Sequence, residues 1–142
     1  MKLYTYYRSS CAYRVRIAMN LKNLDYEMIP IHLLNEGGMQ FKPDYLAVNT
    51  SAQVPCLVDG DLTLGQSMAI VEYLEEKHPN PPLLPKDPKD RAIVRQMCEV
   101  INSGTQPLQN LSVVMSLGEM FKATAEQKKT WMQNCGAMAS WW

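Results

Sequence analysis

The stretch KLYTYYRSSCAYRVRIAMNLK, residues 2–22, decides the fold. Its first part, Lys2–Tyr6, contains aromatic and β-branched residues in alternation, which predicts a short strand. Ser9 and Ser10 then supply hydroxyl groups suited to capping the start of a helix. A helix is expected over Cys11–Lys22, because apolar residues recur there at i, i+3 and i+4. These residues are Val15, Ala18 and Met19.

The segments that follow complete one α/β domain over residues 1–78. We expect, in chain order, a strand, a short irregular helix, two strands and a last helix: Tyr26–Ile31, Phe41–Val48, Val54–Val58, Leu62–Leu64 and Ser67–Lys77. The first two strands of the domain are joined through a helix and should form a right-handed parallel unit. The last two are joined by the tight turn at Asp59-Gly60-Asp61 and should pair antiparallel. The order β-α-β-α-β-β-α is that of a thioredoxin-like domain.

The last helix of this domain, Ser67–Lys77, is expected to be amphipathic. Its apolar face carries Ile70, Tyr73 and Leu74. Its polar face carries Glu72, Glu75 and Glu76, which we expect to face water.

A proline-rich segment separates this domain from a helical second part. Five prolines lie within residues 79–88, a composition that continues neither a helix nor a sheet and predicts an interdomain linker. Residues 89–142 have a helical pattern and predict an all-α domain. Gly104 and Pro107 should kink or split its first helix, since proline removes a backbone donor. Thr124-Ala125-Glu126-Gln127 matches a capping box and should open a last helix.

Composition and charge exclude several classes of protein. Hydrophobic residues make up 46% and charged residues 20% of the chain, an ordinary balance for a folded soluble protein. Fourteen basic and fourteen acidic side chains cancel, so neither nucleic acid nor an anionic membrane is an expected partner. Since no apolar run suits a secretory signal or a membrane span, we expect a cytoplasmic protein whose ligand is a small molecule or another protein.

The cysteines and histidines predict no metal site. The four cysteines lie too far apart for a zinc ribbon or a Cys-x-x-Cys pair and should be free thiols: Cys11, Cys56, Cys98 and Cys135. His32 and His78 have no partner at metal-ligand spacing, so both are interpreted as ordinary surface or half-buried side chains.

The triplet Ser9-Ser10-Cys11 is the best candidate for chemistry. At a helix N-terminus, the helix dipole and hydroxyl donors would stabilise a thiolate, either the protein's own or a ligand's. Thioredoxin-like folds carry their sulfur chemistry at this position, between the first strand and the first helix. The alternative is that Ser9 and Ser10 only cap the helix, with Cys11 a small buried apolar residue.

The residues Ser9–Ala18, SSCAYRVRIA, resemble the signature Ser-Ser-Cys-x-x-Arg-Val-Arg-Ile-Ala of the zeta-class glutathione transferases, also known as maleylacetoacetate isomerases. The similarity continues through Gln53–Pro55, Gln66–Leu74 and Gln106–Ser112. It therefore covers roughly the first 120 residues, in both predicted domains. The resemblance implies a glutathione-binding thioredoxin-like domain followed by an all-α glutathione transferase C-terminal domain.

The resemblance also implies site residues. Ser9 is the expected first donor to the glutathione thiolate, with Ser10 and Cys11 assisting. Val54, which precedes a proline that the family holds in cis, should pair through its backbone with the cysteinyl unit of glutathione. The remaining expected contacts are Gln66 and Ser67 at the γ-glutamyl carboxylate, Gln40 at the glycyl end, Gln106, Asn110 and Ser112 from the second domain, and Arg14 from the signature.

The reaction implied by the resemblance is the cis–trans isomerisation of maleylacetoacetate, with glutathione as nucleophilic cofactor. Related enzymes also act on small α-halo acids. Family members continue past the length of this chain with further helices, so the all-α domain is expected to be incomplete. Two alternatives are a shortened, non-catalytic protein that binds glutathione and dimerises, and a thiol transferase that depends on Cys11.

An apolar stripe near the end of the chain predicts a homodimer. Trp131, Cys135, Met138 and Trp142 recur at i, i+4, i+7 and i+11 on the last predicted helix. Because nothing else in the sequence is expected to cover this stripe, we expect a second copy of the chain to do so.

Overall fold

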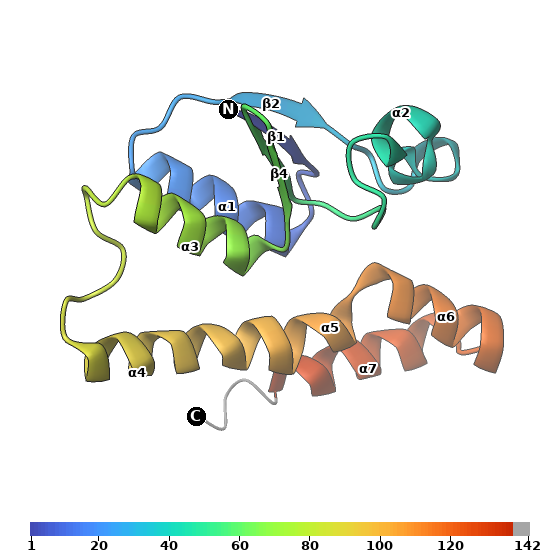
Figure 1. Cartoon of the computed structure of the whole chain (residues 1–142). Coiled ribbons are helices and arrows are strands. Elements are labelled where there is room, and N and C mark those ends of the chain that lie inside the picture. The colour runs from blue at the N-terminus through green and yellow to red at the C-terminus, as the bar shows by residue number, and fades with distance from the viewer. Residues whose placement is uncertain (138–142) are drawn as a thin grey trace. The chain divides into compact units, whose positions relative to one another are not determined.

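The computed structural model describes residues 1–137. The chain forms two compact units, one from Met1 to Leu83 and one that begins at Leu84. Figure 1 shows the elements of both units, which are described separately below.

The first unit contains a mixed four-stranded sheet. Its strands are β1 (Lys2–Thr5), β2 (Glu27–Pro30), β3 (Cys56–Asp59) and β4 (Leu62–Gly65), in the order β2-β1-β3-β4. Strands β1 and β2 are parallel, whereas β3 runs antiparallel to both β1 and β4. The predicted parallel unit and the predicted antiparallel hairpin are therefore both confirmed. Gly60 has a φ of 63° in the hairpin turn, a conformation that glycine adopts without strain.

Two long helices of the first unit pack against one another. Helix α1 (Ser10–Leu21) follows β1, and helix α3 (Ser67–Lys77) follows β4. The expectation of one short irregular helix around 41–48 is only partly correct, because the helical residues of this segment form three separate elements. The structure has two 3₁₀ turns, η1 (Asn35–Gly37) and η2 (Met39–Phe41), and a short helix α2 (Pro43–Leu46). Lys42 is extended, with a ψ of 147°, because the residue before a proline avoids the α conformation.

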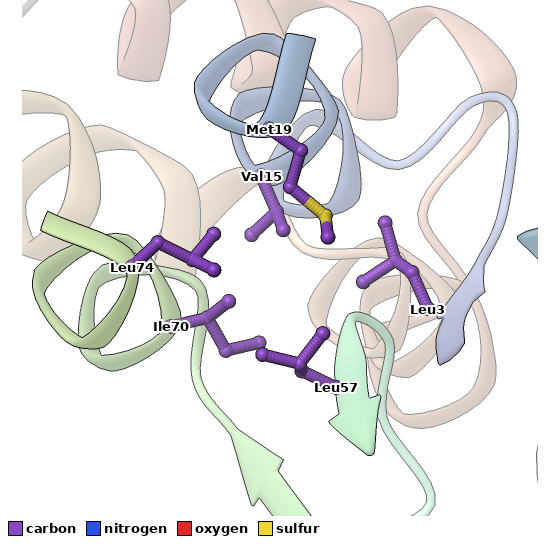
Figure 2. Packing of buried hydrophobic residues seen from close by; sticks show 6 residues of the cluster. All are labelled: Leu3, Val15, Met19, Leu57, Ile70 and Leu74. Carbon is purple, nitrogen blue, oxygen red and sulfur yellow. The ribbon is translucent and has the colours of Figure 1, made fainter. Parts of the chain in front are cut away.

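The core of the first unit lies between the sheet and these two helices. Figure 2 shows six fully buried side chains that converge from both layers: Leu3, Val15, Met19, Leu57, Ile70 and Leu74. The predicted inner face of α1 is thus confirmed, since Val15, Ala18 and Met19 are all buried. Burial of each such aliphatic side chain stabilises the fold by about 1.5–3 kcal/mol. This core fixes the positions at which α1 and α3 begin.

The expectation that Glu75 faces water is wrong. Glu75 is buried, and its carboxylate lies 2.6 Å from the Nζ of the equally buried Lys22. The Lys22 ammonium also donates to the carbonyls of His78 and Pro81, at 2.7 and 2.9 Å. Both Glu75 oxygens accept from the Leu83 amide, at 3.0 and 3.1 Å. Glu75 is buried because α1 lies against α3 and places Lys22 beside it.

The second unit consists of helices. They are α4 (Pro88–Glu99), the π-helical segment η3 (Val100–Thr105), α5 (Gln106–Gln109), α6 (Leu111–Phe121) and α7 (Ala125–Ala137). Pro88, the last residue of the expected linker, is in fact the first residue of α4. The kink or split expected at Gly104 and Pro107 is confirmed in part, because the π-helical segment that contains Gly104 separates α4 from α5. The backbone leaves the helical conformation only at Asn110, with φ −58° and ψ 143°. Pro107 lies in the first turn of α5, where a missing amide is tolerated.

The predicted capping box at the start of α7 is confirmed. The Thr124 amide donates to Gln127 Oε1 at 2.8 Å, and the Gln127 amide donates to Thr124 Oγ1 at 3.2 Å. Each side chain therefore satisfies one backbone donor of the other residue, which is the reciprocal pattern that defines the motif.

The apolar stripe on α7 is partly covered by α5. Cys135 is buried, and Trp131 donates its indole N–H to the Leu108 carbonyl at 2.8 Å. The expectation that nothing in the chain covers the stripe is therefore wrong for Cys135, whereas Trp131 remains 37% exposed. Met138 and Trp142 lie outside the described residues. No helix among residues 1–137 is long and apolar enough to cross a membrane.

Candidate active site

Ser9 occupies the N-cap of α1, as the sequence predicts. Its backbone is extended, and its Oγ accepts a hydrogen bond from the Ala12 amide at 3.2 Å. A serine hydroxyl that accepts one hydrogen bond still has its own proton to donate. The capping role and the proposed chemical role of Ser9 are therefore compatible.

Ser10 and Cys11 form the first turn of α1 beside this hydroxyl. Ser10 is exposed and Cys11 is half-buried with a free thiol. The first turn contains no acidic side chain, so no fixed negative charge opposes an anion at this helix end. The side chains of Ser9, Ser10 and Cys11 thus all belong to the N-terminal turn of α1, at the positive end of its dipole.

A second helix N-terminus is joined to the first by a side chain. Arg14, on α1, donates from Nη1 to the Oγ of Ser67 at 3.1 Å, and Ser67 is the first residue of α3. Ser67 is buried, and its hydroxyl retains a proton because it acts as acceptor toward Arg14. Gln66 precedes it with a positive φ of 63° and an exposed side chain. Both N-termini are positive ends of helix dipoles.

Val54 lies at the end of the segment that leads into β3. The Val54–Pro55 peptide bond is cis, as expected. Val54 lies outside the strand ladder, which begins at Cys56. The side-chain amide of Gln66 donates to Gln53 Oε1 at 3.5 Å, which links the segment before Val54 to the start of α3.

Two residues that fix this segment were missed from the sequence. The Tyr45 hydroxyl and the Asn49 side-chain amide both donate to the Gln53 carbonyl, the latter at 2.9 Å. Burial raises the pKa of Tyr45 to about 12, so its hydroxyl stays protonated and can donate at neutral pH. No periodicity or motif marks either residue, because the contact depends on the path of the chain between α2 and β3.

Gln40 is more deeply buried than a surface glutamine. It is 7% exposed, and its Nε2 donates to the Leu33 carbonyl at 3.3 Å. Its Oε1 is buried and has no hydrogen-bond partner among residues 1–137. A buried acceptor without a partner costs about 1–3 kcal/mol, so a ligand donor would find a favourable contact there.

The three candidates of the second unit lie within eight residues of one another in the sequence, in and between α5 and α6. Gln106 is the first residue of α5, and Asn110 caps α6 by accepting from the Ser112 amide at 3.1 Å. The Ser112 hydroxyl also donates to the Asn110 side chain, at 3.0 Å. The role of Gln106, Asn110 and Ser112 toward a ligand stays a prediction.

Comparisons with known proteins identify the family to which this chain is similar. Residues 3–82 match the family described as "Glutathione S-transferase, N-terminal domain". The chain is 51% identical over 131 residues to a maleylacetoacetate isomerase of Rattus norvegicus, a match that covers 92% of this chain and 58% of the rat protein. It is 49% identical over 133 residues to a zeta-class glutathione S-transferase of Euphorbia esula, covering 94% of this chain and 57% of the plant protein.

Solved structures give the same result. A bacterial maleylpyruvate isomerase described as a zeta-class glutathione S-transferase matches with a TM-score of 0.94 and 35% identity, over 98% of this chain and 65% of that protein. A maleylacetoacetate isomerase of Methylobacterium extorquens with bound malonate and glutathione matches with a TM-score of 0.92 and 40% identity, over 98% and 64%. The chain spans a little less than two thirds of the length of these relatives. The chain therefore belongs to the glutathione S-transferase family, within which it resembles the zeta class.

Proposed function

We propose that this protein binds glutathione in its first unit and uses it to isomerise maleylacetoacetate from cis to trans. The observation that carries the proposal is the Ser9 hydroxyl, which is fixed at the N-terminus of α1 and keeps a proton to donate. The names of relatives that share about half of the residues support this substrate.

Glutathione would bind along the edge where both helices begin. The backbone of Val54 pairs with the cysteinyl unit, and Gln66 and Ser67 receive the γ-glutamyl carboxylate at the N-terminus of α3. Support for the second contact comes from the Ser67 hydroxyl, which Arg14 orients as a donor. Gln40 contacts the glycyl end, where the glycyl amide N–H donates to the unpaired, buried Oε1 of Gln40.

The reaction needs a glutathione thiolate near neutral pH. Lowering a thiol pKa by two units requires about 2.7 kcal/mol of preferential stabilisation of the thiolate. A charge-assisted hydrogen bond from Ser9, the dipole of α1 and the assistance of Ser10 and Cys11 together stabilise the thiolate by a free energy of that order.

The thiolate adds to one carbon of the cis double bond, so that a carbon–sulfur bond forms and the electron pair moves into the neighbouring carbonyl. Rotation about the resulting single bond follows. Return of the electron pair re-forms the double bond in the trans geometry and expels the thiolate, so glutathione is not consumed. The same thiolate would displace halide from a small α-halo acid.

Two substitutions test the proposal. Ser9→Ala should abolish most isomerase activity while leaving glutathione binding in calorimetric titration nearly unchanged, since the lost hydroxyl acts on the thiolate. Cys11→Ala should retain most of the activity. Loss in Cys11→Ala with retention in Ser9→Ala would indicate a Cys11-dependent thiol transferase instead. Glutathione binding by the unsubstituted chain without turnover would indicate a non-catalytic binding protein.

We further propose that the protein is a cytoplasmic homodimer. Helix α4 and the start of η3 expose the apolar residues Ile93, Met97 and Ile101 at i, i+4 and i+8, a surface that a second copy would cover. All four cysteines are free thiols, as is usual in a reducing compartment. A monomer at micromolar concentration in sedimentation equilibrium would contradict the dimer, and fractionation of cells would test the location.

A further inference from the structure

Ser9 ends a tight turn that connects β1 to α1. The turn consists of Tyr6, Tyr7, Arg8 and Ser9, and the Ser9 amide donates to the Tyr6 carbonyl at 3.0 Å. Ser9 then begins α1, since its carbonyl accepts from the Tyr13 amide at 2.9 Å. The position of the Ser9 hydroxyl therefore depends on the geometry of this turn.

Arg16 contacts the turn from the second turn of α1. Its Nη2 donates to the Tyr7 carbonyl at 3.4 Å, and its Nη1 donates to Thr5 Oγ1 at 3.3 Å. Thr5 is the last residue of β1 and is buried. The Tyr13 ring lies against the same guanidinium, with 5.3 Å between Arg16 Cζ and the ring centroid. The two guanidinium donors of Arg16 thus connect the end of β1 and the turn after it to helix α1.

We propose that Arg16 is a positioning residue for the reaction, acting through the Tyr6–Ser9 turn on the Ser9 hydroxyl. The inference rests on the proposed function, because it assigns Arg16 a part in forming the glutathione thiolate. Arg16 holds the Tyr7 carbonyl two residues before Ser9, and none of its contacts involves Ser9, Ser10 or Cys11. Without it, the Tyr7 carbonyl loses its guanidinium donor, whereas the turn keeps its own backbone hydrogen bond and the ring contacts of Tyr6 and Tyr7 with His32.

Lysine cannot replace Arg16 fully. A lysine ammonium lacks the planar fork that reaches Thr5 and Tyr7 together, although it can still donate to one of them. Arg16→Met removes both donors and keeps an apolar stem of similar length against Tyr13. A graded effect, with Arg16→Lys between wild type and Arg16→Met, is therefore expected.

The first readout is independent of glutathione. In native-state hydrogen exchange on the full chain, the Ser9 and Tyr13 amides should exchange about tenfold faster in Arg16→Met, because the turn opens more often. The Ile70 amide, which donates to the Gln66 carbonyl at 3.0 Å within α3, serves as internal control and should not change. Equal protection of Ser9 in wild type and both variants would overturn the inference.

The second readout concerns the bound thiol. The pH dependence of thiolate ultraviolet absorbance in the glutathione complex should shift upward by about one pH unit in Arg16→Met, and kcat should fall about tenfold with little change in KM for glutathione. Arg91→Met is the matched control, since Arg91 also donates to a backbone carbonyl, that of Pro85, at 3.4 Å.

The outcomes separate the two proposals. Failure of the wild-type chain to bind glutathione would overturn the proposed function and this inference together. The inference alone would be overturned if the wild-type complex contains an ionised thiol and the Arg16→Met complex has the same thiol pKa and the same kcat. If Arg16→Met does not fold, Arg16→Lys decides the test. Faster exchange of the Ser9 amide and a raised pKa of the bound thiol in Arg16→Lys would support the inference, whereas an exchange rate and a thiol pKa equal to those of wild type would overturn it.

Discussion

Replacing Lys22 with methionine is expected to destabilise the first unit severely. The Lys22 ammonium is buried and contacts the Glu75 carboxylate and the carbonyls of His78 and Pro81, all within 2.6–2.9 Å. The substitution removes the positive charge of Lys22 from beside the Glu75 carboxylate, which is itself buried. Breaking a buried ion pair from one side costs about 3–5 kcal/mol.

That loss is large against the whole stability of a domain of this kind, about 5–15 kcal/mol. Urea unfolding followed by circular dichroism should therefore show a much lower midpoint for Lys22→Met, with an unchanged slope. The matched control is Lys2→Met. Lys2 forms a pair with Glu27 at 3.8 Å in which both side chains are more than half exposed, so a loss of at most about 1 kcal/mol is expected. A loss below 1 kcal/mol in Lys22→Met, or equal losses in the two variants, would refute the reasoning.

Two further predictions concern the ligand site and the pH dependence of stability. A Cβ on Gly38 would lie 2.6 Å from the Nε2 of Gln40, whereas one on Gly37 would meet nothing within 4 Å. Both glycines have positive φ, 77° for Gly37 and 99° for Gly38, so both alanine variants bear backbone strain and only Gly38→Ala adds the contact with Gln40. Gly38→Ala alone should weaken glutathione binding, by about tenfold in calorimetric titration, and equal weakening in Gly37→Ala would contradict the assigned role of Gln40. The hydrogen bond from Lys77, followed by that from Tyr73, lowers the pKa of Asp59 below its usual value. The stability that the ionised Asp59 carboxylate provides is therefore present at neutral pH and lost as the pH falls below about 4. Asp59→Asn should lower the urea midpoint of unfolding at neutral pH and make no difference near pH 2. Equal urea midpoints for wild type and Asp59→Asn at neutral pH would contradict this role of the carboxylate.

Local patterns were sufficient to predict the elements that depend on short-range contacts. The helix over Ser67–Lys77 has the predicted bounds, and the capping box at Thr124 forms as expected. The N-cap at Ser9 is also confirmed, because capping depends only on the residues of one helical turn.

Residues that depend on packing between distant segments could not be predicted. The sequence pattern placed Glu75 on a polar face, since nothing near it in the sequence indicates that Lys22, more than fifty positions earlier, lies beside it. The contacts of Tyr45 and Asn49 with the Gln53 carbonyl were missed for the same reason. The end of the helical backbone at Asn110, rather than at Pro107, was also not predicted, because Pro107 lies in the first turn of α5, where its missing amide is tolerated.

The two serines of the site have the same hydrogen-bonding state. Ser9 Oγ accepts from the Ala12 amide, and Ser67 Oγ accepts from the Arg14 guanidinium. In each case a protein donor occupies a lone pair of the hydroxyl, so the hydroxyl proton points away from that donor and is available to an anion. Each hydroxyl also lies at the positive end of a helix dipole. Glutathione with an ionised thiol carries three anionic groups, and in the proposed complex Ser9 would donate to the thiolate and Ser67 to the γ-glutamyl α-carboxylate, which leaves the glycyl carboxylate to other contacts. Because neither hydroxyl donates to a protein acceptor among residues 1–137, neither would have to give up such an acceptor on binding, a condition that favours the stabilisation of charge by hydroxyl donors.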